Sequence, residues 1–392
     1  MYHLLKKIIY QINKKIFLKS LLKKLYPYLT GFFLILFFKN NQIKIHIPSS
    51  NVTDDSDDEL ISRIFQFYKK MKSDQSKVNN IYNPSSMWQK FIDEKFIILN
   101  NSINDNNICN FKFFLQNFGN NKCYLGIENQ DFIKRYSDNI FLKKFLTYEI
   151  LGGQHKLWNY FNNHQVDISE INMPKFGNQN GATIKGNFFV LGSFFNHIYA
   201  DIIINFFDSK KKNILVDLGG GYGKLAYYIL KKINPTFIDF DIPETLVLAA
   251  YYLSKSFPNK KKFFYGETTF KSMTAGKFDM LFLPCWEIEK LENDQVYFTI
   301  NKNSLGEMRP ESAKNYLDHI SRISKYFFSM NHEKFRNIFH NNNFSLINKE
   351  YNKLGKFKQL MRYPDLGHLT YENNKINLES DIFFYLYEKK IN

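Results

Sequence analysis

The stretch that decides the fold is NILVDLGGGYGKLAYYILKKINPTFIDFD, residues 213–241. Ile214–Leu218 is a short apolar run of strand length, and a cluster of glycines follows it directly. Apolar residues then recur at helical spacing, and Phe237–Phe240 is a second strand-like run that ends on Asp241. A strand, a glycine-rich turn, a helix and a second strand together make half of a βαβ unit of the nucleotide-binding kind.

The spacing of the glycines indicates which ligand the turn suits. Gly219, Gly221 and Gly223 stand in G-x-G-x-G order, whereas a dinucleotide fingerprint needs its third glycine at position 224, which is Lys224. With Asp217 before it, this order resembles motif I of the class I S-adenosylmethionine (SAM) methyltransferases. Glycines suit the turn because a Cβ would keep the backbone away from a ligand. The resemblance implies that SAM is the cofactor and that Asp217 lies near its methionine amino group.

Asp241 has two interpretations. It lies about 20 residues past the glycines, where such folds place an acid for the ribose hydroxyls. Alternatively it caps the next helix, because Asp241-x-x-Glu244 with Pro243 in the first turn is a fair capping box. We favour the ribose ligand, since the spacing and the strand end both agree with it.

The second half of the chain alternates strands with helices. Helices are expected over Pro243–Ser254 and Pro310–Ile323, and strands over Phe278–Pro284, Val296–Ile300, Tyr326–Met330 and Asp381–Lys389. This alternation predicts an α/β fold of the Rossmann-like, class I methyltransferase type, with a mostly parallel sheet and helices on both faces. Trp286 is predicted to lie beside the adenine, although tryptophan is more often a core residue. Asn301, after the fourth strand, is also assigned to the cofactor.

Five segments narrow the family. VDLGGGYGK, FDIPETL, FLPCW, INKNSLGEM and SMNHE, in that order, resemble the sugar O-methyltransferases of bacterial surface-polysaccharide gene clusters. The similarity runs from Gly152 to the C-terminus, and NSLGEM and FDIPETL are its narrower signals. It implies transfer of a methyl group from SAM to a sugar hydroxyl in polysaccharide or glycan biosynthesis. Whether the acceptor is a nucleotide sugar, a lipid-linked glycan or a polymer stays open.

A sugar hydroxyl is a poor nucleophile at neutral pH, so the reaction calls for a base. Ligands of open α/β sheets lie beyond the carboxyl ends of the strands, where Glu307 and His332 are found. His332 is the first choice because its ordinary pKa lies near working pH. The alternative interpretation is that His332 is a surface loop residue. Glu307 could instead bind sugar hydroxyls or cap a helix. The loop-rich segment 149–186 is a candidate substrate loop or a plain connection, and its His155 and His164 are the reserve bases.

No H-x-x-H pattern is present, and we expect no metal. Two rival functions remain. One is methylation of another small-molecule hydroxyl, and the other is a non-catalytic, membrane-associated scaffold with a SAM fold. Methylation of nucleobase amines is disfavoured because Asn301–Ser304 lacks the proline pair of an N-P-P-Y-like motif.

Composition limits the partners and the compartment. The 392 residues carry a net charge of +16, which invites a nucleic-acid partner. We expect none, because the lysines are spread out, arginine is scarce and no nucleic-acid-binding motif is present. Three scattered cysteines, Cys109, Cys123 and Cys285, favour a reducing cytoplasm over a disulfide framework.

Three regions are expected. Residues 1–53 hold nine lysines and no acidic residue, with apolar residues at helical spacing. They form either a basic amphipathic segment on the anionic inner membrane face or a helix packed on the protein. Residues 54–150 are expected to be a helical lid or accessory region, and residues 151–392 the methyltransferase domain.

Overall fold

The computed structural model describes residues 43–47, 50–127, 140–162, 165–207, 213–268, 277–339, 343–352, 355–368, 370–372, 375–377 and 380–390. Most of the predicted basic segment 1–53, and the reserve base His164, lie outside the described residues. No helix among these residues has the length and apolar character needed to cross a membrane.

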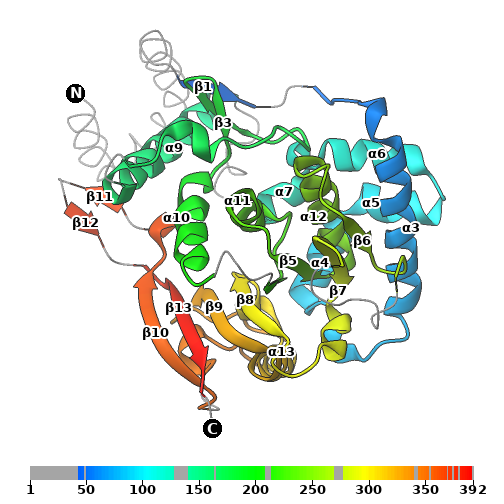
Figure 1. Cartoon of the computed structure of the whole chain (residues 1–392). Helices are drawn as coiled ribbons and strands as arrows, with labels where there is room; N and C mark the ends of the chain where they lie inside the picture. The colour runs from blue at the N-terminus through cyan, green and yellow to red at the C-terminus, as the bar shows by residue number, and fades with distance from the viewer. Residues whose placement is uncertain are drawn as a thin grey trace, which may run out of the picture.

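An eight-stranded sheet in the order β10-β13-β9-β8-β4-β5-β7-β6 forms the centre of the described structure (Figure 1). All neighbouring strands pair in parallel except β13, which runs antiparallel to both β9 and β10. The strands are β4 (Ile214–Leu218), β5 (Thr236–Asp241), β6 (Lys262–Phe264), β7 (Met280–Pro284), β8 (Val296–Lys302), β9 (Ser324–His332), β10 (Phe357–Pro364) and β13 (Ile382–Lys389). This mostly parallel, Rossmann-like α/β sheet confirms the predicted fold class.

The helices cover the two faces of this sheet. The principal ones are α10 (Ser193–Ile204), α11 (Lys224–Lys232), α12 (Pro243–Ser256) and α13 (Pro310–Ile323). Helices α10, α11 and α12 lie on one face and α13 on the other (Figure 1). The chain proceeds from β4 through α11 and β5 toward one edge, and then returns to β8 on the other side of β4. The strand order therefore reverses between β4 and β8, where ligands bind in such sheets.

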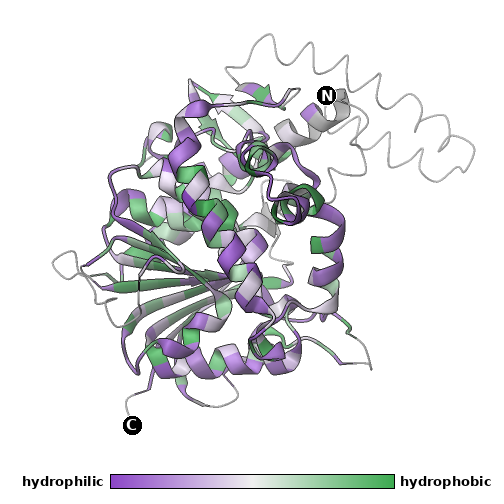
Figure 2. Ribbon diagram, turned by 90° about the vertical axis from the view of Figure 1, so that its right-hand side faces the viewer, coloured by the Kyte–Doolittle hydropathy of each residue, from purple (hydrophilic) through white to green (hydrophobic). Residues whose placement is uncertain are grey.

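The sheet is held by apolar burial on both faces. Every residue of β4 and β7 is buried, and α12 is buried along most of its length. Figure 2 shows the strands as mainly hydrophobic, while the helices that flank them carry hydrophilic residues. Strands buried on both faces read as continuous apolar runs, which is why β4 could be placed from the sequence.

The N-terminal region packs against the sheet domain. Its helices are α3 (Asp58–Gln75), α4 (Ser86–Lys95), α5 (Ile97–Asn104), α6 (Ile108–Gln116), α7 (Lys122–Ile127) and α9 (Ile140–Asn162). Helix α3 contacts α12, and Tyr251 of α12 donates a 2.9 Å hydrogen bond to Asp57. Strand β1 (Ile43–His46) pairs with β2 (Gly181–Ile184), which pairs with β3 (Asn187–Phe189); β11 (Thr370–Glu372) and β12 (Lys375–Asn377) form a small hairpin.

Two expectations from the sequence are corrected here. The segment from residue 149 does not begin as a loop, because helix α9 continues through Gly152 and Gly153 to Asn162. The buried apolar side chains of this helix, such as Trp158, pack against α10 and outweigh the low helix propensity of glycine. The predicted boundary at residue 151 therefore falls inside a helix.

The capping box at Asp241 is also wrong. Helix α12 has Ile242 as its N-cap and no side-chain capping bond. Glu244 is instead fully buried, where it accepts hydrogen bonds from Lys72 at 2.6 Å and from Tyr68 at 3.3 Å. Asp241 is thus free of the capping role and faces the pocket described below.

Candidate active site

A pocket opens at the carboxyl ends of β4, β5 and β8, at the point where the strand order reverses. Four parts of the chain line it: the end of β4 and the glycine loop with the start of α11, the end of β5 with the start of α12, the end of β8 and the loop after it with the start of α13, and residues 81–88 of the N-terminal region. Asn196 of α10 and Ile127 of α7 complete the lining. The predicted helical lid therefore contributes part of the pocket wall.

The glycine loop is shaped by backbone conformations that favour glycine. Gly219, Gly221 and Gly223 all have positive φ, at 75°, 65° and 86°. A Cβ on Gly219 would lie 2.3 Å from Ser304 Oγ, so this position also needs glycine for space. The Gly221 N–H donates a 3.1 Å hydrogen bond to Asp241. The predicted glycines and the predicted ribose acid thus form one contiguous surface.

Three carboxyl groups face this pocket. Asp217 at the end of β4 is 2% exposed, and burial together with repulsion from Asp241 raises its pKa to about 7. Burial raises the pKa of Asp241 to about 6, against the hydrogen bonds that it accepts. Burial likewise raises the pKa of Glu307 to about 7. Lys224, Lys302 and Arg309 line the same pocket, but burial still disfavours the ionised form of each carboxyl group. A cationic ligand bound beside these carboxyl groups would stabilise their ionised forms.

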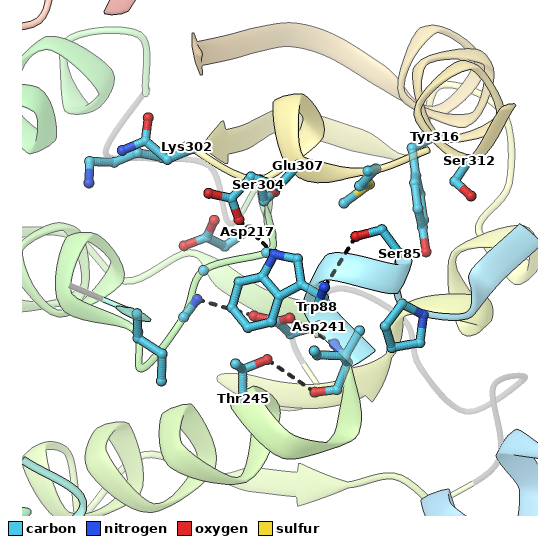
Figure 3. Close-up of a pocket in the computed structure, with 18 of the residues that line it drawn as sticks. Ser85, Trp88, Asp217, Asp241, Thr245, Lys302, Ser304, Glu307, Ser312 and Tyr316 are labelled. Atoms are coloured by element: carbon cyan, nitrogen blue, oxygen red, sulfur yellow. Dashed lines mark hydrogen bonds between the residues drawn. The ribbon is translucent and has the colours of Figure 1, made fainter. Parts of the chain in front are cut away.

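Glu307 is held by a residue from the N-terminal region. The indole Nε1 of Trp88 on α4 donates a 2.6 Å hydrogen bond to Glu307 Oε2. Figure 3 shows the Trp88 ring in the middle of the pocket, between Glu307 and Asp241. The backbone N–H of Trp88 is in turn bonded to Ser85 Oγ at 3.4 Å. The carboxyl group that could act as base therefore already has a hydrogen-bond donor in front of it.

Asn301 positions the loop after β8 rather than facing the pocket. Its Nδ2 donates to Leu218 O at 2.8 Å and to Ser304 Oγ at 2.5 Å. Its Oδ1 accepts from Leu305 N at 3.2 Å and from Asn331 Nδ2 at 3.0 Å. The amide thus has no donor or acceptor left for a ligand, and Asn301 is outside the pocket lining. It fastens the Glu307 loop to the end of β4.

Two further predicted residues are not brought into the pocket. Trp286 is buried beyond β7, with its ring edge-on to Tyr265, and does not line the pocket. His332 ends β9 and is also outside the lining. Its Nδ1 lies 2.8 Å from Asp381 Oδ2, and its ring contacts Phe335. His155 stacks near Trp158 and is likewise absent from the lining. Of the predicted bases that lie among the described residues, Glu307 alone lines this pocket, and the expected absence of a metal stays a prediction.

Several lining residues were missed by the sequence analysis. Trp88 lies on α4 and Asn196 on α10, and no local sequence signal distinguishes either residue. Lys224 directly follows the last glycine of the motif, and this position was the signal that could have found it. It is buried, and its Nζ donates a 2.7 Å hydrogen bond to Leu191 O.

Comparison with known proteins gives matches in solved structures only. No protein-family model matches the chain. No curated protein matches it either. Mitomycin 7-O-methyltransferase aligns at 11% identity over 50% of this chain and 57% of its own, with a TM-score of 0.33. A SAM-dependent methyltransferase from Aquifex aeolicus aligns at 13% identity over 49% and 89%, also at 0.33. Magnesium protoporphyrin IX methyltransferase from Synechocystis PCC 6803, with bound SAH, aligns at 10% identity over 50% and 85%, at 0.32. The chain spans little more than half of the mitomycin enzyme, and TM-scores this low carry no argument about its chemistry.

Proposed function

We propose that this chain is a SAM-dependent O-methyltransferase that acts on a sugar hydroxyl. The observation that carries the proposal is the grouping of Asp217, Asp241 and Glu307 in one pocket beside the glycine loop. The pocket lies where open α/β sheets bind their ligands. It combines a nucleotide-type cradle with a carboxyl group suited to take a proton.

The charge of the pocket favours SAM over a dinucleotide. Lys224, Lys302 and Arg309 also line the pocket, but Asp217 and Asp241 lie directly against the glycine loop. There they would repel a pyrophosphate and attract the sulfonium and ammonium groups of SAM. The third glycine, Gly223, has φ 86°, and a Cβ at this position would lie 2.7 Å from Leu253 Cδ1. This glycine stands one residue earlier than the third glycine of a dinucleotide fingerprint. We assign to Asp241, which accepts a hydrogen bond from the Gly221 N–H, the role of accepting hydrogen bonds from the ribose hydroxyls. When bound, SAM would supply an activated methyl group on sulfur.

We assign the proton-accepting role to Glu307. A general base works best when its pKa lies near the operating pH, and burial brings the pKa of Glu307 to about 7. Trp88 Nε1 on α4 already donates a hydrogen bond to this carboxylate. A substrate hydroxyl group at the same place in the pocket would therefore also lie within hydrogen-bond distance of Glu307. The acceptor hydroxyl would take the place of that N–H and give its proton to Glu307 as the methyl group is transferred.

The acceptor class rests on two supports. Glu307 belongs to the NSLGEM segment, one of the narrower signals of the sugar O-methyltransferase resemblance. Around it the pocket mixes aromatic and polar side chains, namely Tyr82, Tyr316, Arg309 and Ser312. Such a mixture suits a ring that presents both apolar C–H faces and hydroxyl groups.

The test begins with binding. Isothermal titration calorimetry of the full chain should show SAM binding and no NAD binding. SAH release is then measured with nucleotide sugars, lipid-linked sugars and simple phenols as acceptors. Transfer to a sugar supports the proposal, whereas transfer to phenols alone would point to another small-molecule hydroxyl. SAM binding without transfer to any acceptor would favour the scaffold alternative, and NAD binding in place of SAM would refute the cofactor assignment.

A further inference from the structure

We propose that the first turn of α13 binds a phosphate group of the acceptor, through Arg309, Ser312 and the backbone N–H groups at the start of the helix. This inference rests on the proposed function and narrows its substrate class. The acceptor is then a sugar that carries a phosphate or diphosphate group, as nucleotide sugars and lipid-linked sugars do. Arg309 and Ser312 both line the pocket, together with Tyr316 one turn further along α13.

The start of α13 offers backbone N–H groups to an anion. The helix begins with Pro310, which has no N–H, and Ala313 N already donates to Arg309 O at 2.9 Å. The N–H groups of Glu311 and Ser312 therefore have no acceptor within the helix. No side chain among the described residues caps this end. The helix has 14 residues, and the positive end of its dipole favours an anion at this turn.

Two buried side-chain atoms at the same turn have no hydrogen-bond partner. Among the described residues, Ser312 Oγ and Arg309 Nε are such atoms, and Ser312 is only 3% exposed. Buried polar atoms are nearly always hydrogen-bonded in folded proteins. The guanidinium N–H can only donate and the hydroxyl group can also donate, so both atoms call for an acceptor. A phosphate group supplies several acceptor oxygens, and guanidinium groups bind it with two parallel hydrogen bonds.

The charge of Arg309 remains available to a ligand. Its Nη2 donates to the carbonyl oxygen of Asn80, which fixes the guanidinium group beside the N-terminal region. Glu311 Oε1 lies 3.7 Å from Arg309 Nε, but the Glu311 side chain is 52% exposed. An ion pair exposed to water in this way is weak. An anion bound in the pocket would therefore compete well for the guanidinium group.

The turn lies at a suitable distance from the proposed base. Met308 and Arg309 have extended backbone conformations, so the side chains of Glu307 and Arg309 lie on the same side of the chain. Two residues of extended chain span about 6.5 Å. This span is comparable to the width of one sugar ring. A phosphate bound at Arg309 would thus leave a hydroxyl group of the attached sugar beside Glu307.

The carboxyl groups assigned to the cofactor lie away from this turn. Figure 3 shows Ser312 and Tyr316 on the side of the pocket opposite to Asp217, with Glu307 and Trp88 between them. Burial raises the pKa of Glu307 to about 7, so near neutral pH this carboxyl group is partly protonated and repels an anion less. The pocket therefore has an acidic side for a cationic cofactor and a side at α13 for an anionic acceptor.

Calorimetry on the full chain tests the subsite with phosphate ligands alone. Pyrophosphate, uridine diphosphate and farnesyl diphosphate are titrated, so that the nucleotide and the lipid sources of a diphosphate are compared. The proteins are wild type, Arg309→Met, Arg309→Lys and Ser312→Ala. Lys314→Met is the matched control, because Lys314 is an exposed residue of the same helix outside the pocket lining. SAM affinity is measured for every variant.

Wild type should bind all three diphosphates, and more weakly as salt rises. Arg309→Met should weaken this binding about 10- to 100-fold because charge-assisted hydrogen bonds are lost, and Arg309→Lys should recover part of the loss. Ser312→Ala should weaken it about 2- to 10-fold. Diphosphate affinity of Lys314→Met and SAM affinity of all variants should stay near those of wild type. Tighter binding of uridine diphosphate than of farnesyl diphosphate supports a nucleotide sugar, and the reverse order supports a lipid-linked sugar.

Three results would overturn the subsite. The first is a wild type that binds SAM but none of the diphosphates. The second is an equal loss of diphosphate affinity in Arg309→Met and Lys314→Met, which would show that only the overall charge of the protein matters. The third is an equal loss of SAM and diphosphate affinity in Arg309→Met, which would show that Arg309 only supports the fold. Wild type that binds diphosphates but not SAM would instead refute the proposed function, so the two failures are distinguishable.

Discussion

Replacing Glu307 by Gln tests the proposed base most directly. Glutamine keeps the shape of the side chain and an oxygen that can accept from Trp88 Nε1, now 2.6 Å away from the carboxylate. It removes only the ability to take up a proton. Any effect on rate can therefore be attributed to proton transfer, provided that SAM affinity is unchanged.

The size of the effect follows from the pKa. Burial raises the pKa of Glu307 from 4.5 to about 7, which corresponds to about 3 kcal/mol against the ionised form in the ligand-free protein. The wild-type kcat/KM should therefore rise with pH and level off above about 7. Loss of a general base typically costs about 10²–10⁴-fold in kcat. Glu307→Gln should lose this factor together with the rise near pH 7.

Two assays measure the role of Glu307 and its titration. SAH release is followed from pH 5.5 to 9 with an acceptor found in the screen above. Independently of any acceptor, the fluorescence of Trp88 should change as Glu307 titrates, because its indole N–H donates to that carboxyl group. The chain has three tryptophans, and Trp158 and Trp286 do not line the pocket, so Trp88→Phe supplies the background emission.

The reasoning is refuted if Glu307→Gln transfers methyl at nearly the wild-type rate while it binds SAM normally. The same holds if its emission still titrates as in wild type. His332 would then be the next base to test, through His332→Ala, although it is paired with Asp381 outside the pocket lining.

Three further predictions can be tested separately. Asp241→Ala should weaken SAM binding by up to about 1.5–3 kcal/mol for each ribose hydrogen bond lost. Unchanged affinity in calorimetry would leave Asp241 a structural role, as the acceptor for the N–H groups of Gly221 and Ile242. The raised pKa of Asp217, about 7 against 3.8, favours the protonated native state, so its contribution to stability is present at pH 4 and is lost as pH rises toward 7. Asp217→Asn should therefore unfold in urea like wild type at pH 4 but be the more stable protein at pH 8, and equal stability at pH 8 would contradict this. Residues 1–53 should bind anionic vesicles at low salt, with about 1 kcal/mol for each lysine near the surface. Co-sedimentation with vesicles measures this binding for the full chain and for a form starting at Val52. If the full chain does not bind the vesicles and the truncated form has lower thermal stability, residues 1–53 pack on the protein instead.

The local sequence was sufficient to predict those strands, helices and turns whose residue pattern follows directly from their backbone conformation and burial. Continuous apolar runs mark strands buried on both faces, and β4 and α13 have the predicted bounds. Strand β10 was not predicted because it is an edge strand whose residues are mostly exposed, so it lacks that apolar signal. The glycines and Asp241 were found because their spacing is imposed by one short turn within a single βαβ unit.

The pocket, by contrast, depends on long-range packing. Trp88 reaches Glu307 across 219 residues of chain, and Asn196 lines the same pocket as the glycine loop because α10 packs against α11. His332 and Glu307 looked alike in the sequence, since both were expected at the carboxyl ends of parallel strands. His332 is the last residue of β9 and lies outside the pocket lining, whereas the loop after β8 brings Glu307 into it. The sequence by itself determined most strands of the sheet and the glycine turn with Asp241 beside it, because residues close together in the chain form them. Only the tertiary structure decided which side chains face one another across the pocket, because that choice depends on how distant helices pack and on which buried polar atoms find partners.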